Sequence, residues 1–347
     1  MTTTPKLSYE ESLEKTVVSN EKCMGCGACV IVCPFACLEY AEEKPRLVKN
    51  CEKCGICARV CPRFEWQPSV IETFVFGRER KPEETFGIYR RMVVAQASDE
   101  ELRRKCQDGG VVTALLKFAL EKGIIEAAVV SGLAQDKPLL PHPVLATNAA
   151  ELLACAGTRY TYSPNLFALK EGILQKKKSL AYVGTPCQIQ AIRRIGMASL
   201  KRYVEPIKFT IGLMCTESFT YEGLTRYIEK TLDASLGEVV KMNIKGQLLI
   251  TTKSGEIKTV PLKEAKQYTR QGCLPCTDFS SEFADISAGG LGMADWTFVI
   301  IRTSKGEEIF SEAEKAGVIK TRPVEGEKFA SDLLVKLSEK KRKKANI

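Results

Sequence analysis

Histidine is almost absent from this sequence, and its scarcity narrows the chemistry that the chain can perform. The 347 residues contain one histidine, His142, which we expect to lie in a loop because it stands between two prolines. Catalysis by a His dyad or a Ser-His-Asp triad is therefore all but excluded, and so is a His-rich metal site.

Long apolar runs are also lacking. None approaches the roughly 18 residues that span a bilayer, and the acidic first residues contain no apolar core of a secretory signal. We therefore expect a cytoplasmic, reducing environment in which thiols are free to bind metal. Part of the net charge of +9 lies in the last residues, LSEKKRKKANI. For these we expect either a solvated helix end or a contact with acidic lipid or an acidic partner subunit.

Cysteine, in contrast, is abundant: the chain has 15, and nine of them fall between residues 23 and 61. Two similar runs, CMGCGACVIVCP and CEKCGICARVCP, form an internal repeat with the spacing C-x2-C-x2-C-x3-C-P. This spacing is typical of ferredoxins with two 4Fe–4S clusters, in which the fourth cysteine of each run ligates the other cluster. Two zinc sites are the alternative, and the complete doubled pattern argues against them.

The repeat assigns the ligands of two clusters and so predicts electron transfer. The first cluster is predicted to be held by Cys23, Cys26, Cys29 and Cys61. The second is predicted to be held by Cys51, Cys54, Cys57 and Cys33. Glycines at 25, 27 and 55 give both loops room to turn and bring backbone N–H groups to the sulfides.

The composition divides the chain into three parts. Residues 1–70 are predicted to form an α+β ferredoxin-like domain, with two short strands between the cysteine runs and short helices ended by prolines. Residues 71–88 are predicted to be a linker that packs through its aromatics. Strands and helices alternate over 89–347, which predicts a larger α/β domain. Within it we expect a hairpin around 253–255 and an irregular cysteine-bearing insertion near 270–295.

Seven cysteines remain outside the repeat. Cys273 and Cys276 form a C-x2-C pair, which suits zinc, a redox disulfide or half of a cluster site. Cys187 and Cys215 each follow a predicted strand, and strand carboxyl ends meet at one edge of an α/β sheet. The four thiols would then hold a third 4Fe–4S cluster, an outcome that spacing alone leaves open. We expect buried structural thiols at Cys37, Cys106 and Cys155.

Three loops are candidates for binding a phosphate or a ribose. A Gly-Gly pair precedes the predicted helix at residue 111, where backbone amides and the helix dipole attract an anion. Residues 156–165 combine Thr, Arg, Tyr and Ser, and residues 285–296 form a Gly-rich loop with two acids. None is a G-x-G-x-x-G fingerprint opening a helix, and no P-loop lysine motif is present. Each loop, taken alone, is more often a simple turn.

In their order along the chain, these segments resemble a known family. QDGG (107–110), AGTRYTYSPN (156–165), VGTPCQIQA (183–191), GLMCTES, GCLPCTD and DISAGGLG are similar to motifs of the beta subunits of coenzyme F420 hydrogenases and dehydrogenases. The resemblance runs from about residue 88 to the end. A two-cluster arm on such a domain is most similar to the F subunits of archaeal F420H2 dehydrogenases, which feed a membrane quinone or methanophenazine reductase.

The resemblance implies an α/β flavin-binding domain with FAD, a nearby third 4Fe–4S cluster and coenzyme F420 as substrate. The cluster would be held by Cys187, Cys215, Cys273 and Cys276. The implied FAD contacts are Gln107, Gly109, Gly110, Thr158, Arg159, Tyr160, Ser163, Asn165, Thr185, Pro186, Gly289 and Gly290. Hydride transfer between bound cofactors needs orientation rather than an acid or base, so we expect no catalytic residue. Lys241 and Lys263 are the lysines we expect near the anionic F420 tail.

The function implied is oxidation of reduced F420, with electrons passing through three clusters to a partner complex. Two alternatives stay open. One is a ferredoxin-dependent reductase of F420 or another acceptor through FAD. The other is an electron-relay beta subunit of a hydrogenase, formate dehydrogenase or heterodisulfide reductase complex. The expected partners are F420 and other electron-transfer subunits, which would hold the chain at the cytoplasmic face of a membrane; no nucleic acid is expected.

Overall fold

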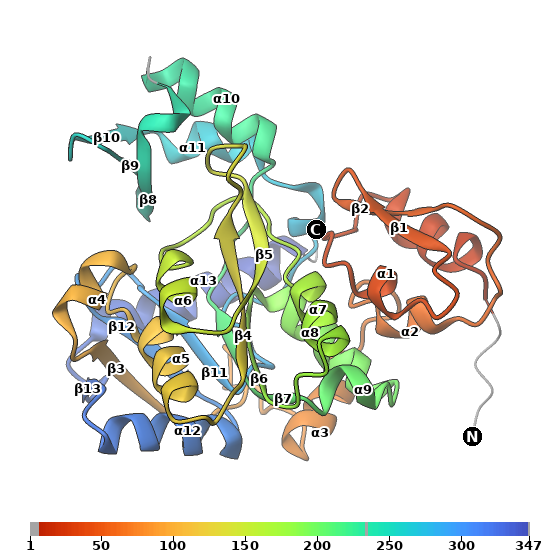
Figure 1. Cartoon of the computed structure of the whole chain (residues 1–347), viewed down its shortest axis with the longest axis horizontal. Helices are drawn as coiled ribbons and strands as arrows, with labels where there is room; N and C mark the ends of the chain where they lie inside the picture. Colours follow the sequence, from red (N-terminus) through yellow and green to blue (C-terminus); the bar gives the residue numbers. More distant parts are fainter. Residues whose placement is uncertain (1–6, 233–234, 346–347) are drawn as a thin grey trace.

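One large mixed sheet forms the centre of the computed structural model, which describes residues 7–232 and 235–345 (Figure 1). Its strand order is β13-β3-β12-β11-β7-β6-β4-β5. The strands are β3 (Arg91–Ala97), β4 (Ala127–Leu133), β5 (Pro141–Ala146), β6 (Leu180–Gly184), β7 (Ile207–Leu213), β11 (Ile286–Gly289), β12 (Thr297–Ile301) and β13 (Ile319–Arg322). Strands β4, β6, β7 and β11 run parallel, and the remaining neighbours pair antiparallel. The predicted larger domain of strands and helices is confirmed.

Continuous apolar runs place this sheet in the interior. Every residue of β6 and β12 is buried, as expected when helices cover both faces. One face packs against α5 (Val111–Glu121), α6 (Ala149–Ala154) and α12 (Ser304–Lys315), and α4 (Glu100–Lys105) follows β3. The other face carries α7 (Leu166–Leu174), α8 (Pro186–Met197), α9 (Lys201–Val204) and α13 (Lys328–Ala345). No helix among the described residues combines the length and apolarity needed to cross a membrane.

Helix α8 begins sharply, and this start positions a thiol. Thr185 and Gln188 form a capping box, and Pro186 occupies the first turn, where its missing N–H costs no hydrogen bond. Cys187 therefore lies at the carboxyl end of β6. The neighbouring parallel strand β7 ends two residues before Cys215, so the strand order brings the two thiols to the same edge.

An N-terminal arm, residues 7–67, sits beside the sheet domain (Figure 1). It contains a π-helix η1 (Glu10–Val18), α1 (Ala28–Val32), β1 (Leu38–Ala41), β2 (Lys44–Leu47) and α2 (Ile56–Val60). The two short strands and the short helices are confirmed, whereas η1 was not expected. Helices α1 and α2 pack against α7 and α8. At Gly27, where φ is +80°, a Cβ would lie 2.8 Å from the Phe167 ring, so this contact of the arm with α7 requires glycine.

The segment expected as a linker, residues 71–88, begins inside α3 (Pro68–Phe76) and is buried at its two ends, whereas residues 77–79 and 81–83 are exposed. Ile71 joins the core between the sheet and α8, and Glu72 is buried. The carboxylate of Glu72 pairs with Arg80 further along the same segment. The segment therefore fastens the arm to the larger domain.

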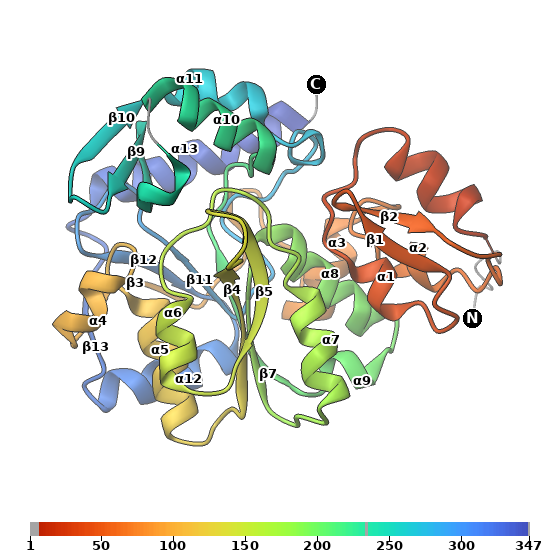
Figure 2. The same cartoon turned by 45° about the horizontal axis from the view of Figure 1, so that its top comes forward.

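Between β7 and β11 the chain forms a small separate layer, the insert (residues 221–268), which lies over one end of the large sheet (Figure 2). Its sheet has the order β10-β9-β8. The elements are α10 (Tyr221–Leu232), β8 (Val239–Lys245), β9 (Gln247–Thr252), β10 (Ile257–Val260) and α11 (Leu262–Ala265). The turn between β9 and β10 confirms the predicted hairpin, and the insert has its own apolar core.

The predicted loop around His142 is wrong. His142 lies in edge strand β5, opposite Gly132 of β4. Prolines on both sides suggested a loop, but proline is tolerated on an edge strand, where an N–H group need not enter the ladder.

A matched pair of substitutions tests the two sides of helix α7. Leu169 is 0% exposed and lies in the core, whereas Leu174 on the same helix is 71% exposed. We expect Leu169→Ala to lower the free energy of unfolding by about 2–5 kcal/mol, because it leaves a cavity. Leu174→Ala should change it by less than about 0.5 kcal/mol. Urea denaturation of the two purified variants measures both values, and equal effects would contradict the packing described.

Candidate redox centres and cofactor cavity

The first group of arm cysteines gathers at the base of the arm. Cys26 and Cys29 are buried at the start of α1, and Cys61 follows α2. Burial raises the pKa of the Cys26 thiol, and the neighbouring thiols of Cys61 and Cys23 raise it further. The backbone N–H of Gly25 donates to Cys23 Sγ at 3.4 Å, as a loop built around sulfur would. The structure thus brings together the four residues assigned to the first cluster.

The second group lies beside the first. Burial raises the pKa of the Cys57 thiol to about 12. Three further thiols add to this rise, those of Cys51, Cys54 and Cys33. Cys37, for which we expected a buried structural role, is buried next to this group. Its backbone N–H donates to Cys33 Sγ at 3.3 Å, and its own thiol donates to a backbone carbonyl at 3.2 Å.

A third group forms at the carboxyl edge of the sheet. Burial raises the pKa of the Cys215 thiol, and three thiols add to the rise, those of Cys273, Cys187 and Cys276. The backbone N–H of Ser218 approaches Cys273 Sγ at 3.4 Å. The C-x2-C pair and the two thiols after β6 and β7 therefore lie together, as their places along the chain allowed.

Within the described residues, no three or more His, Cys, Asp or Glu side chains converge as the ligands of a single metal ion would. A cubane cluster places its four thiolates on four separate irons, so its ligands surround a volume rather than a point. All three groups consist of thiols alone, which is the ligand set of a 4Fe–4S cluster.

The first and third groups are adjacent. Met24, Tyr162 and Cys187 form one small buried cluster, and the Tyr162 hydroxyl lies 3.5 Å from Cys187 Sγ. The backbone at Gly272 passes so close to the arm that a Cβ there would lie 2.1 Å from the Cys23 carbonyl oxygen. The first and third thiol groups, which come from different parts of the chain, therefore lie in one continuous buried region.

Arg270 joins the arm to this interior. Its side chain is buried, donates to the Met24 carbonyl at 2.8 Å and pairs with Glu43 at 3.0 Å. The guanidinium also stacks over the Tyr162 ring, 4.4 Å from the centroid. A buried cation thus lies between the first and third groups.

A cavity of about 390 Å³ opens at the same edge of the sheet, a size typical of ligand pockets. Ten of the twelve expected FAD contacts line it: Gln107, Gly110, Thr158, Arg159, Tyr160, Ser163, Asn165, Thr185, Gly289 and Gly290. Gly109 and Pro186 do not. Gly109 packs its backbone against Thr297, whose hydroxyl accepts its N–H, and Pro186 is buried in the first turn of α8.

Several polar atoms in the cavity wall are unsatisfied. Gln107 Oε1, Ser131 Oγ, Arg159 Nε and Thr161 Oγ1 are buried and have no partner among the described residues. Burial lowers the pKa of Arg159, and within residues 7–232 and 235–345 no carboxylate pairs with it. Buried polar groups normally have a partner, so the Arg159 Nε–H and the two hydroxyl groups fit an anionic group of a ligand as donors, whereas Gln107 Oε1 would accept from a donor on that ligand.

Several lining residues were not expected. Asn243 and Lys245 reach the cavity from β8, and Asp108 enters it from a left-handed backbone turn with φ +48°. Of the two lysines expected near an anionic tail, Lys241 donates to the Cys106 carbonyl at 2.9 Å, and Lys263 does not line the cavity. The alternation of β8 would have placed Lys241 and Lys245 on one face, but which end of the strand meets the cavity depends on the position of the insert.

The cavity adjoins the third group directly. Tyr162 and Thr185 line the cavity, and Thr185 Oγ1 lies 3.2 Å from Cys187 Sγ. Cys106 and Cys155, expected as structural thiols, also lie in the cavity wall. A ligand bound here would therefore be separated from the third group by single side chains.

The basic C-terminal segment takes part in this region and is not simply a solvated helix end. It continues α13 to Ala345, and residues 346–347 lie outside the described residues. Lys341 is buried and donates to the Cys215 carbonyl at 2.6 Å. Arg342 pairs with Glu282, whereas Lys343 and Lys344 are exposed.

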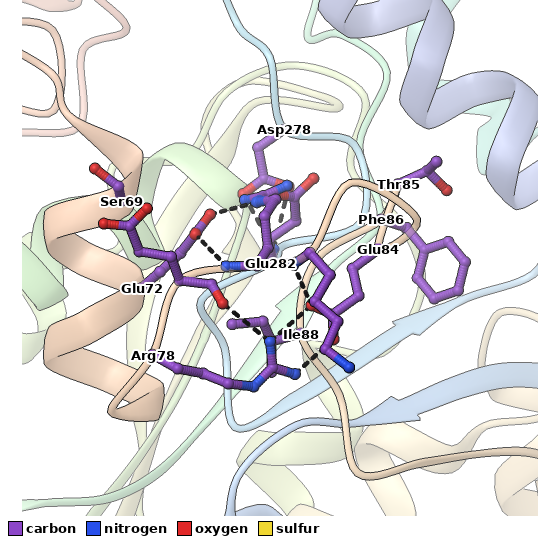
Figure 3. Close-up of polar contacts among 12 residues, drawn as sticks. Ser69, Glu72, Arg78, Glu84, Thr85, Phe86, Ile88, Asp278 and Glu282 are labelled. Atoms are coloured by element: carbon purple, nitrogen blue, oxygen red, sulfur yellow. Dashed lines mark hydrogen bonds and ion pairs between the residues drawn. The ribbon is translucent and has the colours of Figure 1, made fainter.

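A polar network lies next to the third group, since the Cys276 thiol is 3.6 Å from the Asp278 carbonyl oxygen. Figure 3 shows the side chains of this network. Asp278 and Glu282 lie beside Glu72 of α3, and Glu282 pairs with Arg80 and Arg342. Burial raises the pKa of Asp278 to about 6, and the charge of Glu282 contributes to the rise. The network ties three segments distant in sequence, namely α3, the loop after the C-x2-C pair and the C-terminal helix.

Comparison with known families gives three matches along the chain. The model for the N-terminal part of coenzyme F420 hydrogenase/dehydrogenase beta subunits matches residues 92–170, and the model for their C terminus matches residues 177–327. A 4Fe–4S binding domain model matches residues 16–39, which contain the first cysteine run.

Individual relatives agree with these matches. The chain is 40% identical to the coenzyme F420 hydrogenase subunit beta of Methanosarcina barkeri, over 74% of this chain and 89% of that protein. It is 34% identical to the F subunit of the F(420)H(2) dehydrogenase of Methanosarcina mazei, over 94% and 91%. A chain of the F420-reducing [NiFe] hydrogenase complex from Methanosarcina barkeri superposes with a TM-score of 0.73 at 38% identity, covering 77% of this chain and 93% of that chain. The sequence identity is thus higher with the hydrogenase subunit, whereas the match with the dehydrogenase subunit covers more of this chain.

The packing of the arm on the larger domain can be tested at Arg270. Arg270→Met should leave the Met24 carbonyl without its charged donor, at a cost of about 2 kcal/mol, and so speed local opening roughly thirtyfold. Hydrogen exchange measured by mass spectrometry should show this faster exchange in peptides spanning residues 23–29 and 270–276. Arg46→Met, which breaks the exposed pair with Glu39, is the control and should leave exchange there unchanged. Equal protection in both variants would contradict the role given to Arg270.

Proposed function

Because the chain belongs to the coenzyme F420 hydrogenase/dehydrogenase beta-subunit family, we propose that it oxidises reduced coenzyme F420 by hydride transfer to a bound FAD and sends the electrons through three 4Fe–4S clusters to a partner complex. The observation that carries this proposal is the contact of the cavity with the third thiol group through Tyr162 and Thr185. FAD accepts two electrons as a hydride and releases them singly, and a cluster carries one at a time.

The FAD diphosphate is proposed to bind at Arg159 and the start of α5. The unpaired Nε of Arg159 is buried in the cavity wall, where an anion would restore its hydrogen bond. Helix α5, whose N-cap is Gly110, turns its free amides and positive dipole end toward the same cavity. Gly289 and Gly290 also line the cavity, and a Cβ on them would lie 2.6 Å from Met214 Sδ or 2.2 Å from the Asp108 carboxylate, so these glycines make room for side chains of the cavity wall.

Reduced F420 is proposed to enter from the side of the insert. Asn243 and Lys245 of β8 line the cavity, and Lys245 carries the positive charge that an anionic phosphate and glutamyl tail would need. Asp108 lies near Lys245, whose charge opposes the rise that burial causes in the pKa of Asp108. In this arrangement the chain binds and orients two ring systems, and no side chain is required as an acid or base.

The proposed electron route runs from the cavity to the third group, then to the first and the second. The first and third groups share the Met24–Tyr162–Cys187 contact, and the thiols of Cys29 and Cys57 are close enough for one to influence the pKa of the other. At the far end of the arm, Phe35 and Val48 are exposed near the second group. This end is the proposed contact with the accepting complex, of which a membrane quinone or methanophenazine reductase is one form.

Reverse flow is a second candidate, since one structure similar to this chain belongs to a hydrogenase described as F420-reducing. Electrons would then enter through the arm and leave to F420. A relay subunit without a substrate site is less well supported, because such a subunit has no use for a ligand cavity with unpaired polar atoms.

The direct test is oxidation of reduced F420 by the chain purified anaerobically and loaded with iron and FAD. We expect rapid reduction of a viologen acceptor and an iron content of about twelve per chain, four for each cluster. The double variant Cys273→Ser/Cys276→Ser should keep about eight irons and lose the activity, while Lys344→Gln, which changes an exposed residue, should keep about twelve irons and the activity. A fully loaded chain that does not oxidise reduced F420 would exclude the proposal, and faster flow in the opposite direction would favour the second candidate.

Flavin binding can be tested separately at Arg159. Arg159→Met should weaken FAD binding about 10- to 100-fold, because a charge-assisted hydrogen bond contributes about 1.5–3 kcal/mol. Arg104→Met removes an exposed charge on α4 and is the control, which should leave the affinity unchanged. Fluorescence titration of the flavin-free chain with FAD measures both affinities, and the same affinity in both variants would remove Arg159 from the site.

A further inference from the structure

The C-terminal helix α13 connects the cavity to the third thiol group. Leu333 and Leu337 line the cavity, and Lys341 follows at the same spacing of four residues, so the three side chains share one face of the helix. The last turns of α13 lie on the side of the molecule that carries the arm (Figure 2). One helix face is therefore apolar beside the cavity and cationic beside the thiols.

Lys341 is an unusual lysine. It is 9% exposed, and its ammonium donates to the Cys215 carbonyl at 2.6 Å. Among the described residues no carboxylate forms an ion pair with it, although the neighbouring Arg342 pairs with Glu282. A buried cation is costly unless negative charge compensates it.

The acidic groups around Lys341 are the thiols of Cys215, Cys273 and Cys276 and the carboxyl group of Asp278. A 4Fe–4S cluster held by these cysteines would bind them as thiolates, whose negative charge would compensate the buried ammonium. The position of the ammonium is also fixed, because the hydrogen bond to Cys215 holds it against the backbone of one proposed ligand.

We propose that Lys341 is a positioning residue that raises the reduction potential of the third cluster. The inference rests on the proposed function, since it requires a cluster at Cys187, Cys215, Cys273 and Cys276. A cluster held by these four residues would become more negative by one unit on accepting one electron. A fixed positive charge in a medium of low dielectric constant favours the reduced state, and net charge and hydrogen bonding near the sulfurs are known determinants of cluster potential.

The consequence concerns the direction of electron flow. With Lys341 beside it, a cluster nearest the cavity would be the better acceptor, which would favour withdrawal of single electrons from a bound flavin. Arg270 lies on the other side of the third group, toward the arm, and pairs with Glu43, so its charge is partly neutralised. Lys341 has no such carboxylate partner within the part of the chain that the structure describes.

The test compares three variants of the full, iron-loaded chain by redox titration followed by EPR. Lys341→Gln keeps a hydrogen-bond donor and removes the charge, Lys341→Arg keeps the charge, and Lys344→Gln removes an exposed charge from the same helix. We expect Lys341→Gln to lower the midpoint potential of one cluster and leave the other two unchanged. Lys341→Arg and Lys344→Gln should match the unaltered chain. The Cys273→Ser/Cys276→Ser variant identifies the signal that belongs to the third cluster.

The remaining outcomes are distinguishable. If the unaltered chain binds about eight irons, the third cluster is absent and the proposed function itself fails. If Lys341→Gln binds about twelve irons with all potentials unchanged, the inference on Lys341 fails alone. If Lys341→Gln loses four irons while Lys341→Arg keeps them, Lys341 is needed to assemble the cluster, and a role in setting its potential is overturned.

Discussion

The cost of burying thiolates, which carry negative charge, is the constraint on which the rest of this structure depends. Three groups of cysteines lie in the interior, where burial raises the pKa of thiols such as Cys26, Cys57 and Cys215. Thiolates there must be compensated, and iron is the strongest compensation available. The chain adds backbone N–H donors and two buried cations, Arg270 and Lys341. These groups link segments that would otherwise be independent: the arm, the sheet edge and the C-terminal helix.

The order of the proposed centres follows from how the sheet is wound. Parallel strands β6 and β7 deliver Cys187 and Cys215 to one edge, and the same edge forms the wall of the cavity. The arm then packs on helices α7 and α8, and α8 begins at that edge. The proposed transfer in series would thus follow from packing, since no centre would have to move to meet the next.

Local chemistry made the cysteines of the arm predictable, because a cluster fixes the spacing of its ligands. The strand ends also predicted the meeting of Cys187 and Cys215 with the C-x2-C pair, although spacing left its chemistry open. Gly109 and Pro186 do not line the cavity, because here they serve backbone packing and a helix start. Lys245, Leu333 and Leu337 were missed because they reach the cavity only through tertiary folding. The burial of Lys341 could not be foreseen, because its compensating charges lie far away in sequence.

The insert begins and ends at one point of the larger domain. There Phe219 forms backbone bridges with both Thr161 and Thr269, so the outgoing and returning strands of the chain are joined before the insert begins. Beyond this point the insert also contacts the larger domain, because Lys241 donates to the Cys106 carbonyl and the Ile244 N–H donates to the Tyr160 hydroxyl. All twelve predicted cluster ligands lie outside the insert, whereas its Asn243 and Lys245 line the cavity. A change in the insert between relatives would therefore reshape the cavity wall and leave every predicted ligand at its place in the chain.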